Sequence, residues 1–458
     1  MTEQRATALG ATGNVVAARA LRASARIVIV FLLARFYSAA EVATFAYAFV
    51  TSSLVAIVCD LGLTDFAVRE IAAARSSRAV ELAVLKVRTL MVPVAIVTSS
   101  LVITLTSSTP ILAALAIATY VTALSVSDLL GAVHRAHHRY RHDALEAAVP
   151  ALALIASAVC AAMGTTALMF FAALGLTAAG CVGVRVVVAF ARTRPREAVD
   201  AGLPIGALVR NSRWFAARAI AATAMFEIAV VLLQQLSTTD ATAAYAVAQR
   251  PVGLLNQSLA VVAIVFMPTL SRVHAREPAR LGAVAADVNL IYLLLVPGAF
   301  AACMLGGHVF LEMSGDSYVA GMDLVRLLAI ATLLYNGTLT TAPLLAAHHE
   351  RIVVVASVVG VVLLAGVGIA LIPTYGAEGA AIATGVAATG SKLLHVAGYR
   401  MAKLPVGDTR HLAALLGAIA FVGSTMIGGA SYIPILVVGV VASALLAGHR
   451  LSRARLAI

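Results

Sequence analysis

The sequence predicts an all-α polytopic membrane protein with about fourteen transmembrane helices, from its composition and from a periodic pattern of arginine and lysine. Of the 458 residues, 61% are hydrophobic and 12% are charged. Soluble domains are about 45–50% apolar and about 25% charged, and disordered chains are more polar still. A mean hydropathy of +0.98 therefore requires lipid as the solvent for most of the chain.

A helix that crosses the hydrocarbon core needs roughly 20 mainly apolar residues. Because the charged residues interrupt the chain at regular intervals, the spans can be placed one by one. They are expected at residues 16–35, 41–63, 84–106, 110–131, 144–163, 167–191, 213–236, 241–268, 284–306, 321–345, 352–373, 377–399, 410–428 and 432–449.

The connections between these spans alternate in charge. Every second connection carries cations, as does the C-terminal tail, whereas the others are nearly free of them apart from Arg35. Lys and Arg are retained on the cytoplasmic side of a membrane. The pattern predicts an even number of spans, a place in the cytoplasmic (inner) membrane, and both termini in the cytoplasm. It also explains the net charge of +12 without nucleic acid as a partner.

A short internal repeat indicates two lobes. Residues 44–48 open the second span and residues 242–246 open the eighth, and both read Thr-x-Ala-Tyr-Ala. Six spans separate the copies, so the two halves share one orientation and are related by a pseudo-two-fold axis along the membrane normal. The predicted domains are an N-terminal six-helix lobe, a C-terminal six-helix lobe, and two additional helices with a cytoplasmic tail, at residues 1–200, 201–403 and 404–458.

No catalytic residue, cofactor or metal site is expected. The four cysteines lie singly in apolar segments without a Cys-x-x-Cys pair. His134, His137, His138 and His142 alternate with arginines, whose charge would repel a metal cation. Walker A, Gly-x-Ser-x-Gly and His-Glu-x-x-His motifs do not occur, and the predicted external connections are short. An enzyme, such as a polytopic glycosyltransferase, polymerase or ligase, is therefore disfavoured.

Arginines inside the predicted spans are the strongest candidates for a functional site. Arg19, Arg22 and Arg26 share one helix face, because they are three and four residues apart. A span that began after Arg26 would be too short to cross the membrane before Arg35. An arginine that faces lipid costs at least ~2.5–3.5 kcal/mol, so this face should line a water-filled cavity. Arg218 and Arg250 lie in spans of the other predicted lobe.

Several segments resemble one family in their order and spacing. Tyr47 precedes residues 60–63 (Asp-Leu-Gly-Leu) and 69–70 (Arg-Glu), and Tyr245 precedes residues 248–250 (Ala-Gln-Arg) and 266–271 (Phe-Met-Pro-Thr-Leu-Ser). Residues 315–318 (Gly-Asp-Ser-Tyr) and 373–381 (Pro-Thr-Tyr-Gly-Ala-Glu-Gly-Ala-Ala) follow. Together they resemble Wzx-type polysaccharide flippases, which handle O-antigen and exopolysaccharide. These form the polysaccharide biosynthesis protein family, within the MATE/MOP flippase superfamily. The resemblance spans most of residues 14–400.

The resemblance implies a flippase that moves an undecaprenyl-diphosphate-linked oligosaccharide from the inner to the outer leaflet by alternating access, for cell-surface polysaccharide assembly. Its implied partners are this lipid-linked oligosaccharide and membrane lipids, with the polysaccharide polymerase machinery as a further candidate. The planar guanidinium of arginine matches phosphate oxygens. The candidate residues for binding the diphosphate headgroup are therefore Arg22, Arg26, Arg250, Arg19 and Arg218.

Embedded carboxylates are candidates for ion coupling. Glu227, in the middle of the seventh span, is the first candidate for proton or sodium coupling, and Asp60 is the second; for both, a structural pair with an arginine stays open. Three other functions also stay open. A MATE-type cation-coupled multidrug exporter should have an apolar or acidic cavity, and a lipid II flippase should have a cationic one. A passive scramblase or structural partner is the third.

Overall fold

The computed structural model describes residues 21–404 with the exception of residues 23, 74–76, 138–141, 143–145, 147, 194–204, 337–340 and 348. The described residues form helices joined by short connections and include no strand, which confirms the predicted all-α fold class. They group into two compact units, one that ends at Gln234 and one that begins at Gln235. Arg19 and the last two predicted spans lie outside the described residues.

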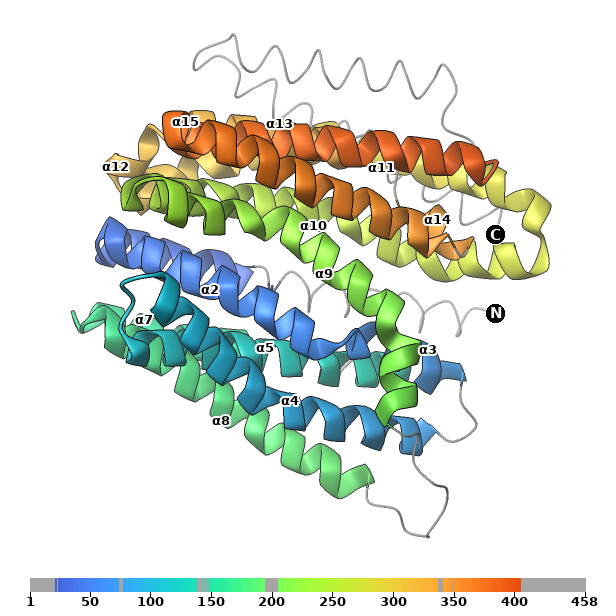
Figure 1. Cartoon of the computed structure of the whole chain (residues 1–458), viewed down its shortest axis with the longest axis horizontal. Coiled ribbons are helices and arrows are strands. Elements are labelled where there is room, and N and C mark those ends of the chain that lie inside the picture. Colours follow the sequence, from blue (N-terminus) through green and yellow to red (C-terminus); the bar gives the residue numbers. More distant parts are fainter. Residues whose placement is uncertain are drawn as a thin grey trace. The chain divides into compact units, whose positions relative to one another are not determined.

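The first unit is a bundle of long helices (Figure 1). Residues 24–36 are helical, and each span predicted between residues 16 and 236 overlaps one helix of this unit. At its centre, α5 packs against α2, α3, α4 and α8. The helices are α2 (Ala39–Asp60), α3 (Leu63–Ala73), α4 (Ser77–Thr106), α5 (Ile111–Ala136), α7 (Ala148–Ala162), α8 (Ala167–Thr193) and α9 (Ile205–Leu236).

Two features of this unit differ from the sequence-based expectation. The helix α3 occupies a segment that was expected to be only a connection; it has 11 residues, too few to cross a bilayer, and carries both apolar and charged side chains. In addition, α9 belongs to the first unit up to Gln234. The boundary predicted from the sequence, between residues 200 and 201, assigns α9 to the second lobe instead. The lobe boundaries stay a prediction.

The described part of the second unit begins near α10 and ends with a helical hairpin. Within it, α10 packs against α11, α13 and α14, and α13 packs against α15. Its elements are α10 (Thr239–Arg276), the 3₁₀ turn η1 (Pro278–Arg280), α11 (Leu281–Ser314), α12 (Asp316–Val319), α13 (Met322–Asn336), α14 (Ala342–Ala346) and α15 (Glu350–Met401).

Two predicted spans, 352–373 and 377–399, form the two arms of α15. Gly376 separates the arms with φ 52° and ψ −126°, a conformation that a helix does not contain. A Cβ atom at Gly379 would lie 2.6 Å from the carbonyl oxygen of Leu371, and one at Gly398 would lie 2.5 Å from the Ile352 side chain. Glycines therefore let the arms pack closely along their length, and both arms are visible in Figure 1.

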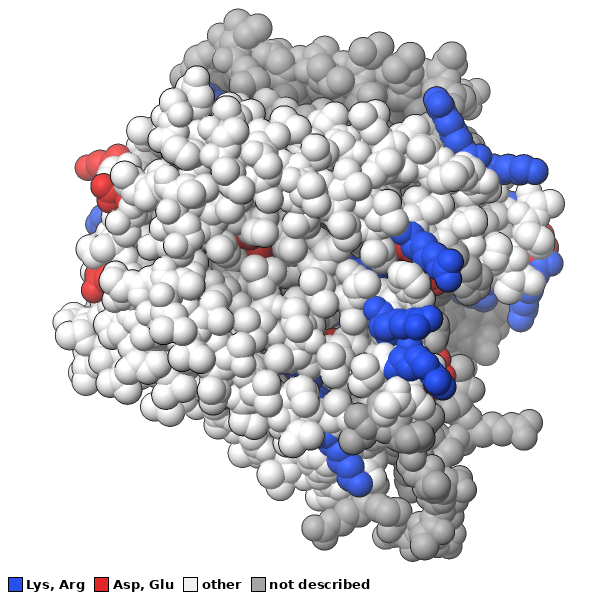
Figure 2. Space-filling model, viewed as in Figure 1, with Lys and Arg blue, Asp and Glu red and all other residues white. Residues whose placement is uncertain are grey.

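The outer faces of the helices are apolar, as lipid contact requires. Six helices in the described part of the chain are long and apolar enough to cross a membrane: α2, α4, α5, α8, α9 and α15. Figure 2 shows that most of the described side chains on the visible face are uncharged. On α4 the exposed apolar residues recur at helical spacing, namely Leu90, Val94, Val97, Leu101 and Leu105.

The repeated tyrosines have equivalent roles in their own units. Tyr47 of α2 and Tyr245 of α10 are 2% and 1% exposed. The Tyr47 hydroxyl hydrogen-bonds with Thr106 of α4, and the Tyr245 hydroxyl hydrogen-bonds with Thr384 of α15 at 3.2 Å. Each tyrosine thus links the first half of its helix to another helix of the same unit. This shared contact accounts for the tyrosine that the two sequence segments have in common.

The turn between α2 and α3 requires glycine. Leu61 and Gly62 have φ values of 53° and 71°, which turn the chain sharply after α2. A Cβ atom at Gly62 would lie 2.3 Å from the backbone nitrogen of Ala216 and 2.8 Å from the carbonyl oxygen of Ser212. The backbone of α9 therefore rests directly on this turn, and only glycine leaves room for it.

We expect Gly62→Ala to destabilise the protein by about 3 kcal/mol or more, because a left-handed conformation and a backbone clash both oppose the methyl group. Gly164→Ala is the matched control: Gly164 has φ 65° but nothing within 4 Å of its Cβ position. The control should lose only about 1–2 kcal/mol. Unfolding of both variants in an SDS titration measures the difference, and equal losses would contradict the packing of α9 on the turn.

Candidate functional site

Arg22 and Arg26 lie together at a small pocket in the first unit. They are four residues apart and share one helix face, as the sequence predicts. Arg22 Nε lies 3.6 Å from Asp128 Oδ1 on α5. The pocket has a volume of about 10 Å³, which is room for about one water molecule. Its lining residues are Arg22, Arg26, Leu124, Ser127, Asp128 and Pro150.

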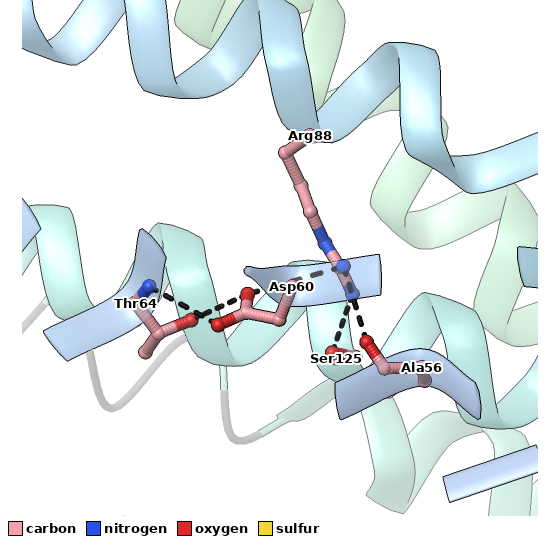
Figure 3. A network of polar contacts seen from close by, with 5 residues as sticks. All are labelled: Ala56, Asp60, Thr64, Arg88 and Ser125. Carbon is pink, nitrogen blue, oxygen red and sulfur yellow. Dashed lines mark hydrogen bonds and ion pairs between the residues drawn. The ribbon is translucent and has the colours of Figure 1, made fainter. Parts of the chain in front are cut away.

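A second arginine, Arg88, is buried nearby in the same unit. Its side chain is 1% exposed and extends from α4 towards the end of α2 (Figure 3). Arg88 donates hydrogen bonds to the carbonyl oxygen of Ala56, at 3.4 Å, and to Ser125 Oγ, and its Nη1 atom lies 3.9 Å from Asp60 Oδ1. The guanidinium therefore joins α2, α4 and α5 at one point.

The carboxylate of Asp60 is held from its other side by Thr64. The Thr64 hydroxyl donates to Asp60 Oδ1 at 2.9 Å and the Thr64 backbone N–H donates to Oδ2 at 3.3 Å, so α3 joins the network as well. Asp60 is one of the two predicted ion-coupling residues. The structure places it in a buried pair with Arg88.

A third ion pair, between Arg185 and Glu146, lies beside the pocket. Arg185 of α8 contacts Glu146 at 2.8 Å, and the Glu146 side chain is 5% exposed. His134 Nε2 lies 3.6 Å from the same carboxylate. Ser127, which lines the pocket, donates to the Glu146 carbonyl oxygen at 3.1 Å. The buried Glu146 pair and the Arg22 pocket are therefore neighbours that share one hydroxyl.

The remaining predicted site residues lie apart from this pocket. Arg218 of α9 forms an ion pair with Asp65 of α3, next to the turn on which α9 rests. Glu227 is half-buried in the middle of α9. Arg250 is half-buried in the first third of α10 and belongs to the second unit. The structure thus brings two of the five predicted headgroup residues, Arg22 and Arg26, to one pocket.

Three charged residues of the first unit have roles that the sequence reasoning missed. Arg88, Glu146 and Asp128 all lie within predicted spans, but none of them is among the candidate site residues that the sequence indicates. A signal for Arg88 was present: the apolar residues of α4 from Leu90 to Leu105 form one outward stripe, and Arg88 lies on another, buried face. Because lipid takes the apolar side, the polar side of such a helix faces inward.

A family model described as polysaccharide biosynthesis protein matches residues 14–274, more than half of the chain. The chain belongs to the polysaccharide biosynthesis protein family. This match confirms the resemblance seen in the sequence, and it covers both Arg22 and Arg26 as well as Arg250. No curated protein matches the chain.

Several solved structures have a similar fold. The lipid II flippase MurJ in an inward closed conformation has a TM-score of 0.67 at 9% identity, over 96% of this chain and 98% of that one. An outward-facing multidrug resistance MATE family transporter of the MOP superfamily has a TM-score of 0.63 at 12% identity, over 89% and 96%. An inward-facing MATE transporter has a TM-score of 0.59 at 13% identity, over 86% and 95%. These likenesses show that the chain shares the fold of these three structures.

The buried pair of Arg88 and Asp60 yields a stability prediction. We expect Arg88→Met to lower the free energy of unfolding by about 3–5 kcal/mol, because Asp60 is left as an uncompensated buried charge. The double variant Arg88→Met, Asp60→Asn should recover most of this loss, since it removes both charges. Thermal unfolding in detergent measures both variants. A double variant that is no more stable than Arg88→Met would show that the pair is not the source of the loss.

Proposed function

We propose that this member of the polysaccharide biosynthesis protein family is a flippase for an undecaprenyl-diphosphate-linked oligosaccharide. It would move the substrate from the inner to the outer leaflet of the cytoplasmic membrane, for the assembly of cell-surface polysaccharide. The observation that carries the proposal is the pocket with Arg22 and Arg26, which lies within a bundle whose outer faces are apolar. A lipid tail can stay in the bilayer while a charged headgroup reaches such a site.

The charge of the pocket indicates the chemistry of its ligand. A diphosphate carries fixed negative charge, and the planar fork of arginine donors fits phosphate oxygens in a bidentate manner. Arg22, Arg26 and Asp128 together give the pocket lining a formal charge of +1, which disfavours an organic cation, the kind of substrate that a MATE-type exporter would need to bind. The arginines therefore favour a lipid diphosphate, and the candidate headgroup residues remain Arg22, Arg26, Arg250, Arg19 and Arg218.

The proposed transport cycle is alternating access, in which two lobes rock around the headgroup site. Both termini would lie in the cytoplasm, since the predicted connections on that side hold the cations. Glu227 is the proposed coupling residue, because a carboxylate at membrane depth is usually functional or paired. Asp60 is the weaker candidate, because its carboxylate is already held by Arg88 and Thr64.

Transport of a labelled undecaprenyl-diphosphate oligosaccharide into the outer leaflet of proteoliposomes tests the function. We expect Arg22→Ala, Arg26→Ala and Arg250→Ala each to lower the rate about ten- to hundredfold, as loss of a charge-assisted hydrogen bond implies. Arg280→Ala is the matched control, since Arg280 is exposed and pairs with Glu277 within the same turn.

Two other outcomes of this experiment would contradict the proposal. Efflux of organic cations from the same vesicles, without lipid transport, would indicate a MATE-type exporter. Transport of lipid II in preference to the undecaprenyl-diphosphate oligosaccharide would indicate a lipid II flippase. A monodisperse elution profile in detergent serves as the folding control for every variant in this experiment.

The coupling role of Glu227 has its own test. We expect wild-type transport to rise when a proton or sodium gradient is imposed, and Glu227→Gln to remove this stimulation while the basal rate persists, because the amide cannot exchange a cation. Glu312→Gln is the control, since Glu312 is exposed and pairs with His308 one turn away. An unchanged gradient response in Glu227→Gln would exclude the residue from coupling.

A further inference from the structure

Arg22 already has an anionic partner in the pocket that we assign to the headgroup. Asp128 Oδ1 lies 3.6 Å from Arg22 Nε, and Asp128 forms part of the pocket wall together with Arg26 and Ser127. With Asp128 in this position the free volume is about 10 Å³, enough for about one water molecule. A diphosphate that bound Arg22 from the side of its Nε atom would therefore have to displace the carboxylate of Asp128.

Asp128 differs from the buried carboxylates of the same unit. The side chains of Asp60 and Glu146 are 6% and 5% exposed, and each is also held by a hydroxyl group, from Thr64 or Ser127. The Asp128 side chain is 43% exposed, although its partner Arg22 is only 16% exposed. Because water can solvate an exposed carboxylate once it leaves its partner, the Asp128 pair opens at a low free-energy cost.

A second exposed carboxylate shows what makes Asp128 distinct. Asp65 is similarly exposed, at 44%, and pairs with Arg218. That pair joins α3 to α9, however, and neither residue lines the pocket. At Asp128 the exposed carboxylate, the pocket and a second arginine, Arg26, come together. This combination is what an exchange of one anion for another requires.

We propose that Asp128 is an internal counter-ion that competes with the substrate's diphosphate for Arg22. The proposal rests on the proposed function and deepens it. In the unloaded protein, Asp128 neutralises Arg22. When the headgroup arrives, phosphate oxygens replace the carboxylate on the guanidinium and Asp128 turns towards water. When the headgroup leaves, Asp128 returns to Arg22.

This exchange solves two physical problems of a lipid-diphosphate carrier. An unloaded protein never carries Arg22 uncompensated within the bilayer, where an unpaired charge is strongly unfavourable. The competition also weakens headgroup binding, because each binding event must displace the carboxylate. Weaker binding lets the headgroup be released on the far side, so the counter-ion favours turnover over tight retention.

The test compares binding and turnover in Asp128→Asn, with the full chain in detergent and in proteoliposomes. Geranyl diphosphate, a soluble prenyl diphosphate, is the probe for binding by calorimetry. We expect Asp128→Asn to bind it about three- to tenfold more tightly than wild type and to transport the lipid-linked oligosaccharide more slowly, because release is slowed. Asp128→Glu restores the negative charge and should return affinity towards the wild-type value.

Controls separate this proposal from the proposed function. Asp323→Asn makes the same chemical change at an exposed pair with Arg326 on α13 and should leave affinity unchanged. If Arg22→Ala abolishes probe binding but Asp128→Asn binds no more tightly than wild type, the counter-ion proposal is overturned and the headgroup site stands. If Arg22→Ala binds the probe as well as wild type, both are overturned. Should Asp128→Asn fail to fold, Asp128→Ser gives the same comparison.

Discussion

A guanidinium inside a membrane-spanning bundle must find a partner, and this requirement organises the first unit. Arg22, Arg88, Arg185 and Arg218 each lie beside a carboxylate from a different segment of the unit. The pairs of Arg88 with Asp60 and of Arg185 with Glu146 are costly to form, because their buried carboxylates lose water, but breaking either pair leaves a buried charge without its partner. Each pair therefore fixes the relative position of two helices more strictly than apolar packing alone would.

The same requirement explains why α3, α4 and α5 meet where α2 ends. Arg88 takes its partners from α2 and α5, and Asp60 takes a further partner from α3. At Gly62 the absence of a side chain leaves room for the backbone of α9, and the Arg218–Asp65 pair links α9 to α3 beside this turn. Polar contacts and close backbone packing thus act at the same end of the unit, and they explain why α9 groups with it.

Carboxylates in this unit fall into two physical kinds, and the difference bears on function. Asp60 and Glu146 are buried and held by several donors, so they behave as parts of the scaffold. The Asp128 side chain is 43% exposed and pairs with Arg22 at the edge of a pocket, which is why we propose that it is exchanged for another anion. A carrier for a charged lipid headgroup needs both kinds, because the scaffold must survive each cycle while the binding site must release its ligand.

The sequence alone determined the membrane class, the positions of the described spans to within about eight residues, the family, and the arginine pair at Arg22 and Arg26. Apolar length, helical periodicity and the ordered motifs are local properties of the chain, and they can be read without a structure. The short helix α3 was missed because its charged residues resemble those of a connection.

Only the tertiary structure decided which charges meet. Arg88 lies 28 residues after Asp60 in the chain, and Arg218 lies 153 residues after Asp65, so no spacing rule connects them. Periodicity shows that a residue faces inward, but the identity of its partner depends on how neighbouring helices are packed and rotated. The pairing of Arg22 with Asp128, and with it the proposed exchange of anions, follows from that packing, because electrostatic partners are chosen by distance in space rather than by order in the sequence.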